Sequence, residues 1–385
     1  MATHEQRIAA SLLAVIVFLI VFGSLYPFSF AADATTPIDL LRGLSFAGTT
    51  RSDVAANVLL YLPLGACLAW LLAPRHGGLA AVVAATLTAA LLSFAIEFAQ
   101  LYETRRVASL ADLACNATGA CAGACFALTI ARTRFRLHSS PFAGVLRHPV
   151  AAALLLSWIG YRLAPFAPVF DPGKWAAAFV PLAGRSWLVP VAVLPQWLAW
   201  LVLVLVCGRL APGRSVAVVA AAMGIVLAGR VLFVGMSLEP AEIMGMAAAL
   251  ALARPLLKLP LAQAAAGLAA ALMVLIAIQG LVPFDFQLAQ DRFALLPFGE
   301  SLTQYRATNL SDMFLRCFTN GALVWLLAQS GLSILAAMGL GAGVVFSIEF
   351  LQTWLPGQTA EITDPLLAVS AGGLIAVFER DAGSE

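Results

Sequence analysis

The sequence predicts an all-α fold, a polytopic bundle of transmembrane helices. Hydrophobic residues fill 62% of the 385 positions and charged residues only 11%, whereas about a quarter of the residues in a soluble domain are charged. A helix needs about 20 apolar residues to cross a bilayer, and uncharged runs of that length recur along the chain. The clearest runs are Ile8–Phe30, Val54–Ala73, Gly77–Ile96, Leu113–Ala131, Ser186–Gly208 and Leu259–Phe284.

Internal similarity predicts three tandem copies of a four-helix unit, and therefore about 12 spans. A Pro-Phe pair closes an apolar run at residues 27–28, 165–166 and 283–284. Each pair is followed by a polar connector, two apolar runs, a compact polar loop and a last apolar run. The three loops have equal length, because 15 positions separate Glu97 from Asp112, Arg230 from Gly245, and Glu349 from Asp364. We expect the copies to occupy residues 1–148, 149–260 and 261–385.

Four of the twelve spans rest on the repeat rather than on hydropathy. The fifth contains Arg162, the eighth is short before Arg254, the tenth contains Arg316, and the twelfth covers only Pro365–Phe378. With four helices in each unit, both termini lie on one side of the membrane. That side receives eleven Arg and Lys residues and the other eight. This bias predicts cytoplasmic termini in a bacterial inner membrane, with the three polar loops facing outward.

Several classes of function lack support in the sequence. No basic run has interleaved aromatic residues, so nucleic acid is not an expected partner. The six cysteines lie inside apolar runs and are expected to pack rather than to bind metal. No histidine lies near the acidic loops, and we therefore expect no metal and no cofactor. Tryptophans such as Trp158 and Trp200 are expected to be anchors at the membrane interface.

The polar residues of the first copy predict an outward-facing pocket with acidic walls and arginine at its rim. Glu97 and Gln100 are three apart and share a helix face. Asp112, Asn116 and two glycines, Gly119 and Gly123, form a stripe on the next span, and the glycines allow close helix packing. The other candidates of this copy are Asp53, Asn57, Arg106 and Ser109, and those of the third copy are Glu349, Gln352, Glu361 and Asp364.

Two interpretations of these polar residues remain open. A carboxylate within a span costs a few kcal/mol even on insertion-based scales, which favours a site for a headgroup, a proton relay or an acid/base pair. Alternatively, the residues bond helices to one another. Ser109 is then the N-cap of the following helix and Asp112 lies in its first turn, where both are favourable.

The pattern resembles the VanZ-like family, named for a teicoplanin-resistance membrane protein. The resemblance rests on the NVLLYLPLG run, on Glu and Gln three apart, and on the Arg-x-x-Ser-x-x-Asp string that continues to Asn and Gly. The first copy matches nearly throughout. The third copy has Gln358 in place of the arginine and Ala368 in place of the asparagine. The middle copy keeps only Glu242, and Arg230 stands where the glutamate belongs.

The resemblance implies a role at the cell envelope. It suggests an integral membrane protein that binds an amphiphile or a lipid-linked precursor at the outer membrane surface and affects glycopeptide susceptibility. Membrane lipid and such a precursor are the expected partners, and the oligomeric state is open. The alternatives are a membrane enzyme with a Glu/Asp acid-base pair acting on a lipid headgroup, a proton-coupled transporter, and a non-catalytic scaffold. In the middle copy, Arg230 is expected to pair with Glu97, Glu349 or Glu242.

Overall fold

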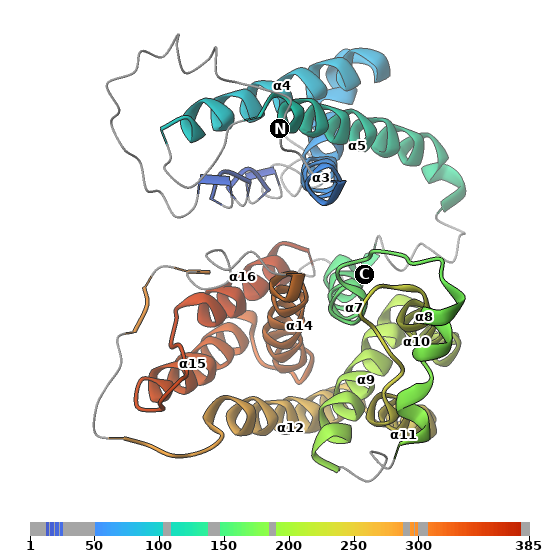
Figure 1. The fold of residues 1–385 in the computed structure, drawn as a ribbon, viewed down its shortest axis with the longest axis vertical. Coiled ribbons are helices and arrows are strands. Elements are labelled where there is room, and N and C mark those ends of the chain that lie inside the picture. Colours follow the sequence, from blue (N-terminus) through green and yellow to red (C-terminus); the bar gives the residue numbers. More distant parts are fainter. Residues whose placement is uncertain are drawn as a thin grey trace. The chain divides into compact units, whose positions relative to one another are not determined.

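The structure is a computed structural model, and it describes residues 51–102, 109–137, 147–184, 190–287, 293–295, 297–298 and 307–378, with ten residues between 13 and 25. Apart from two isolated β-bridges, the regular elements of these ranges are helices (Figure 1). The described positions between 13 and 25 are helical. The helices that follow are α3 (Arg51–His76), α4 (Gly78–Gln100), α5 (Leu110–Leu137), α7 (Pro149–Leu163), α8 (Pro172–Ala177), η1 (Val180–Ala183), α9 (Pro190–Leu210), α10 (Ser215–Leu232), α11 (Pro240–Lys258), α12 (Leu261–Leu281), α14 (Ala307–Gln329), α15 (Ile334–Gln352) and α16 (Thr363–Phe378).

Eight helices of the described ranges are long and apolar enough to cross a membrane: α3, α4, α5, α9, α10, α11, α12 and α15. The helices α7 and α16 are apolar but shorter, and α14 contains Asp312 and Arg316. The prediction of an all-helical, multi-pass membrane protein is therefore confirmed, whereas the count of 12 stays a prediction. The eighth predicted span, whose apolar run is short before Arg254, corresponds to α11, which continues to Lys258.

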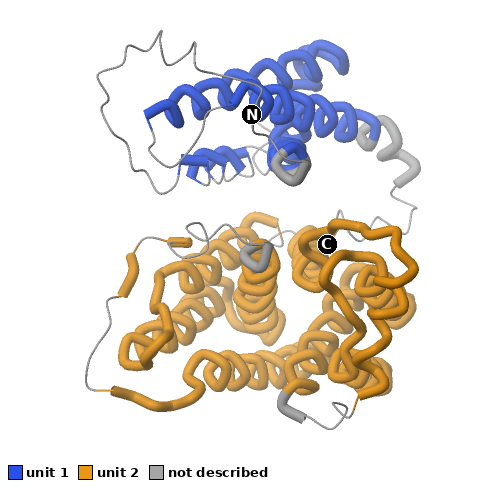
Figure 2. Tube along the Cα trace, viewed as in Figure 1, with its two compact units in different colours: residues 1–140 blue, residues 141–385 orange. Residues whose placement is uncertain are grey.

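The chain divides into two compact units, residues 1–140 and 141–385 (Figure 2). The division of the larger unit into residues 149–260 and 261–385 stays a prediction. Each unit has a hydrophobic core of its own. In the smaller unit, residues such as Ile20, Tyr61 and Leu64 lie in that core.

Glycines allow α3 and α5 to touch through their backbones, as the sequence predicted. A Cβ atom added to Gly119 would overlap the carbonyl oxygen of Val58, and one added to Gly123 would overlap that of Leu62. On α3, a Cβ at Gly65 would overlap the carbonyl oxygen of Ala120. Any side chain at these three positions would force the two helices apart.

The helix α9 runs through the interior of the larger unit (Figure 1). Every residue from Leu198 to Cys207 is buried, as expected for a helix that is apolar on all sides. Trp200 is fully buried in this segment, and Trp158 of α7 packs against it with ring centroids 6.1 Å apart. The prediction that these two tryptophans anchor the membrane interface is therefore wrong, because both lie in the protein core.

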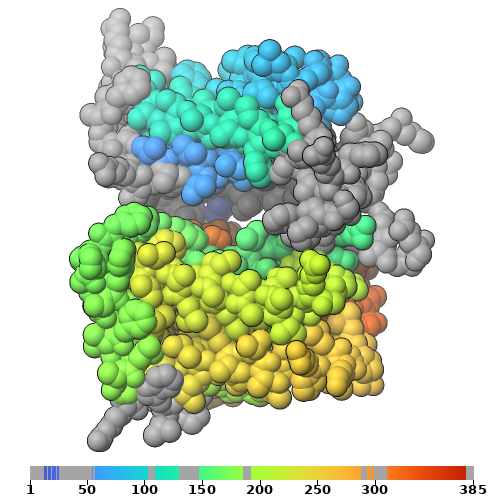
Figure 3. All heavy atoms as spheres, turned by 90° about the vertical axis from the view of Figure 1, so that its right-hand side faces the viewer, coloured from blue at the N-terminus to red at the C-terminus, as the bar shows by residue number. Residues whose placement is uncertain are grey.

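Apolar side chains are exposed on the outer helices, as in a protein surrounded by lipid. Figure 3 shows one face of the larger unit, where α10, α11 and α12 form a continuous surface. These three helices carry exposed residues such as Ile225, Leu252 and Val274.

Backbone bonds fasten the polar connectors to the polar loops within the larger unit. After α7, the amide of Val169 donates to the carbonyl of Leu232, and that of Val234 donates to Ala167. After α12, the amide of Ala294 donates to the carbonyl of Ala360, and that of Ile362 donates to Ala294. Each connector is therefore held against the loop that precedes the last helix of its predicted copy.

Candidate functional site

Glu349 lies in the last turn of α15 and is bonded to the loop that follows. The amide of Glu361 donates to Oε2 of Glu349 at 3.0 Å, and the glutamate is only 6% exposed. None of the ion pairs among the described residues includes Glu349. Its carboxylate is thus buried with a neutral backbone donor as its bonding partner.

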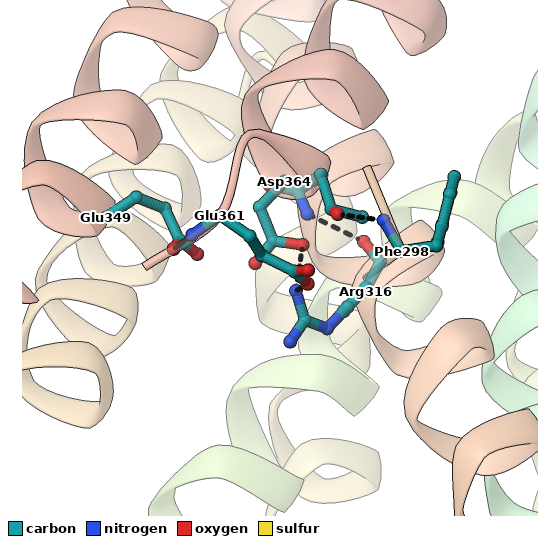
Figure 4. Close-up of polar contacts among 7 residues, drawn as sticks. Phe298, Arg316, Glu349, Glu361 and Asp364 are labelled. Carbon is teal, nitrogen blue, oxygen red and sulfur yellow. Dashed lines mark hydrogen bonds and ion pairs between the residues drawn. The ribbon is translucent and has the colours of Figure 1, made fainter. Parts of the chain in front are cut away.

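Arg316 brings a positive charge to the same region from α14. Its Nη1 lies 2.9 Å from Oε1 of Glu361 and 3.1 Å from Oδ1 of Asp364. Figure 4 shows the guanidinium turned toward these two carboxylates, while Glu349 reaches the backbone of Glu361 from the opposite side. The side chain of Asn320, one turn further along α14, donates to the carbonyl of Arg316 at 3.0 Å. The arginine is therefore fixed by acidic groups at the start of α16.

These residues border an open cavity of about 220 Å³ between α12, α14, α15 and the start of α16. Its polar lining consists of Gln279, Arg316, Thr319, Asn320, Glu349, Gln352 and Asp364. Its apolar lining includes Ile276, Val345 and Ile348, which lie further from the ends of α12 and α15. On α12 and α15 the polar groups therefore lie nearer the helix ends than the apolar ones, whereas Thr319 and Asn320 line the cavity from the middle of α14.

The smaller unit repeats the glutamate-to-loop bond. Glu97 is 5% exposed, and its Oε2 accepts from the amide of Ser109 at 2.7 Å. Ser109 immediately precedes α5, and its Oγ accepts from the amide of Ala111 at 3.2 Å. Ser109 is thus the N-cap of α5, and Asp112 lies in the first turn. This geometry is the one that the scaffold interpretation requires, and it is compatible with a site as well.

The two glutamines occupy equivalent places. Nε2 of Gln100 donates to the carbonyl of Ser24 at 2.8 Å, and Nε2 of Gln352 donates to that of Gly280 at 3.0 Å. Ser24 and Gly280 each lie three residues before the proline of a Pro-Phe pair. The same glutamine therefore links the end of the third helix to the end of the first in both places.

The remaining predicted residues have different outcomes. Asn116 is buried and donates to Oγ of Ser93 at 2.9 Å, so it joins α5 to α4. Asn57 lies on α3 and is half-buried. Arg106, a candidate of the first copy, lies outside the described residues, as does the side chain of Asp53. The structure therefore does not test the predicted arginine rim of the first copy.

In the middle of the chain the carboxylate is held by two arginines. Nε of Arg162 lies 2.7 Å from Oε1 of Glu242, and its Nη2 lies 2.7 Å from Oε2. Nε of Arg230 approaches Oε2 at 3.3 Å. Of the three carboxylates predicted as partners of Arg230, the structure pairs it with Glu242. This cluster has no carboxylate free for a ligand, since both oxygens of Glu242 face guanidinium groups.

The sequence interpretation missed the roles of Arg162 and Arg316. Each was noted only because it weakened a predicted span. An ionisable residue inside a span is itself a signal, because its burial is costly unless it has a partner or a function. Gln279, Thr319 and Asn320 carried no comparable signal, since isolated uncharged polar residues are common in membrane helices.

Together these features define the class: a multi-pass helical membrane protein with a polar cavity near one end of a helix bundle. Residues 9–132 match the model of the VanZ/LLP1 family, which agrees with the resemblance seen in the first copy. No curated protein and no solved structure matches the chain.

Proposed function

We propose that the protein binds the polar headgroup of an amphiphile in the cavity of the larger unit. The observation that carries the proposal is the lining of this cavity, where polar groups from four helices converge beside apolar side chains. Such a lining suits a molecule with a polar head and an acyl chain. Binding pockets for small molecules combine apolar walls with polar groups that fix the orientation of the ligand, and this cavity has both kinds of lining.

The proposal extends to the cellular role. The match of residues 9–132 to the VanZ/LLP1 family favours a role at the cell envelope in glycopeptide susceptibility, with membrane lipid or a lipid-linked envelope precursor as the partner. We further propose that the membrane is the bacterial inner membrane with both termini cytoplasmic, on the basis of the arginine distribution. The cavity, near the ends of α12 and α15, then opens at the outer surface.

We also propose that the chain contains three copies of one four-helix design. The matching glutamine bonds support this for the first and third copies. For the second and third copies, the Pro-Phe phenylalanines Phe166 and Phe284 share a left-handed backbone, with φ of 59° and 62°. The copies differ at the positions that correspond to Glu349 and the loop after it. There the middle copy has the buried cluster of Arg162, Glu242 and Arg230.

Native mass spectrometry of the protein in gently extracted native lipid tests the binding proposal. Gln279→Leu and Thr319→Val each remove a polar group from the cavity lining. Gln263→Leu is the matched control, since Gln263 lies near the opposite end of α12, exposed and away from the cavity. We expect a co-purifying amphiphile that is lost from the two cavity variants and retained by the control. Equal lipid occupancy in all four proteins would refute the proposal.

A structural role is the second candidate, and the loop bonds of Glu97 and Glu349 favour it. A scaffold tolerates Glu97→Gln, because the amide oxygen still accepts the bond from Ser109. It does not tolerate Gly119→Leu, since that side chain separates α3 from α5. If only the glycine variant loses function, the polar residues act in folding rather than in binding.

A further inference from the structure

The charges around the cavity differ in how far they are compensated. Three carboxylates and one guanidinium lie close together: Glu349, Glu361, Asp364 and Arg316. Arg316 is engaged with Glu361 and Asp364 at 2.9 and 3.1 Å. Glu349 lines the cavity, is more than nine-tenths buried, and belongs to no ion pair among the described residues. The acidic groups of the lining, Glu349 and Asp364, therefore outnumber its one basic group, Arg316.

A buried carboxylate without a cation is costly, because burial removes its hydration and one backbone hydrogen bond restores only part of it. A ligand that carries a positive charge would supply the missing partner. A headgroup whose only charge is negative would instead meet the carboxylates of Glu349 and Asp364, and the one arginine of the lining, Arg316, already pairs through Nη1 with two carboxylates. The sign of the lining thus selects the class of ligand.

We propose that the cavity takes a primary ammonium group at the head of an amphiphile. This inference rests on the proposed function and specifies its ligand. An ammonium group is a compact cation with three N–H donors. The Glu349 carboxylate provides the charge, and the side-chain oxygens of Gln279, Thr319 and Gln352 provide further acceptors on the cavity wall. Since Gln352 donates its Nε2 to Gly280, its amide oxygen remains an acceptor.

The size of the cavity agrees with this choice. Ligand pockets for drug-sized molecules span about 300–1,000 Å³, and this cavity has about 220 Å³. An aminoethyl head is small enough for such a space. The apolar wall formed by Ile276, Val345 and Ile348 then contacts the carbon atoms that follow the head.

The test measures binding of three soluble short-chain lipids to the full-length protein in a neutral detergent. The probes are dihexanoyl-phosphatidylethanolamine, its N-acetylated derivative, and dihexanoyl-phosphatidylglycerol. Dodecylammonium is a fourth probe, which carries the ammonium without a phosphate. The variant is Glu349→Gln, whose amide oxygen still accepts from the Glu361 amide. The control is Glu239→Gln, because Glu239 is an exposed carboxylate outside the cavity.

We expect phosphatidylethanolamine to bind at least tenfold more tightly than its N-acetylated derivative, and Glu349→Gln to remove that preference while Glu239→Gln keeps it. Binding of dodecylammonium with the same dependence on Glu349 places the recognition in the ammonium group, so that aminolipids and other amine-bearing amphiphiles are both ligands. If dodecylammonium fails to bind while phosphatidylethanolamine binds, the ammonium requires the phosphodiester, and an aminolipid is the ligand.

Two results would overturn the inference. Equal binding of the acetylated lipid, or a preference for phosphatidylglycerol, would show that the cavity does not select an ammonium, and the proposed function would stand with another ligand. If none of the probes binds and no native lipid co-purifies with the wild-type protein, the proposed function itself fails. An unchanged melting temperature of Glu349→Gln ensures that a loss of binding is not a loss of fold.

Discussion

Replacing Glu242 with glutamine leaves two arginines inside the larger unit without their counter-charge. Glu242 is fully buried, Arg162 is 4% exposed and Arg230 is 11% exposed. The scale for surface ion pairs, about 0–1 kcal/mol, therefore does not apply. Breaking a buried pair by removing one partner costs about 3–5 kcal/mol, because a charge then remains buried without compensation. We expect a loss of this size for Glu242→Gln.

The geometry also predicts which of the two arginines contributes more to stability. Arg162 makes two contacts of 2.7 Å with Glu242, whereas Arg230 makes one of 3.3 Å. Arg162→Leu should therefore cost more than Arg230→Leu, because the Arg230 contact is an ion pair in which Nε makes no hydrogen bond. Loss of the repulsion between the two guanidinium groups offsets part of the second change.

Thermal melting of the detergent-solubilised protein, followed by size-exclusion chromatography, measures these effects. For a unit of 150–250 residues, 1 kcal/mol corresponds to about 2–4 °C, so Glu242→Gln should lower the melting temperature by about 6–20 °C. The triple variant with Arg162→Met, Glu242→Leu and Arg230→Met should recover much of this loss, because apolar residues often replace a buried ion cluster without cost. A Glu242→Gln protein that melts within 2 °C of wild type, or one more stable than Arg230→Leu, would refute the reasoning.

Three further predictions follow from the packing and the hydrogen bonds. Gly119→Ala should lower the free energy of unfolding by about 1–3 kcal/mol, because the added Cβ would overlap the backbone of Val58. Gly343→Ala should leave the melting temperature unchanged, because a Cβ there meets open space. Gln352→Leu should cost about 1 kcal/mol in the same assay, through loss of its bond to a helix-end carbonyl; an unchanged protein would contradict that role. Burial and two nearby arginines lower the pKa of His148 in the folded protein. The unfolded chain therefore binds the proton more tightly, and the stability falls as the pH drops from about 6.5, the ordinary pKa, toward the lowered pKa of the folded state. His148→Gln should remove that part of the acid sensitivity, and an identical pH profile would count against it.

Much of the fold was accessible from sequence because apolar length is nearly sufficient to predict a membrane span. The runs Val54–Ala73 and Gly77–Ile96 lie within or close to α3 and α4. The packing role of Gly119 was also predictable, since glycine has no side chain to hold helices apart. Hydropathy failed for α14, where Arg316 makes the segment polar although it lies in the bundle.

The candidate site was only partly predictable. Glu349, Gln352 and Asp364 line the cavity as the polar loop pattern suggested. The sequence favoured the first copy because its motif is complete, yet the cavity lies among residues 276–364, in the predicted third copy, where the motif is partial. A motif shows which residues recur, but the space between helices depends on side chains from all of them.

The amino-acid sequence by itself determined that this is a multi-pass helical protein, that a VanZ-like pattern fills its first third, and that an acidic pair ends two of its spans. These properties follow from composition and local spacing. The tertiary structure decided which charges meet. Arg316 pairs with Asp364 across 48 residues of sequence, and Arg162 pairs with Glu242 across 80. Such pairs depend on which helices pack together, and uniformly apolar helices have no hydrophobic periodicity from which that packing could be predicted. For the same reason, only the structure shows that α9 is the buried helix and that Trp200 faces protein rather than lipid.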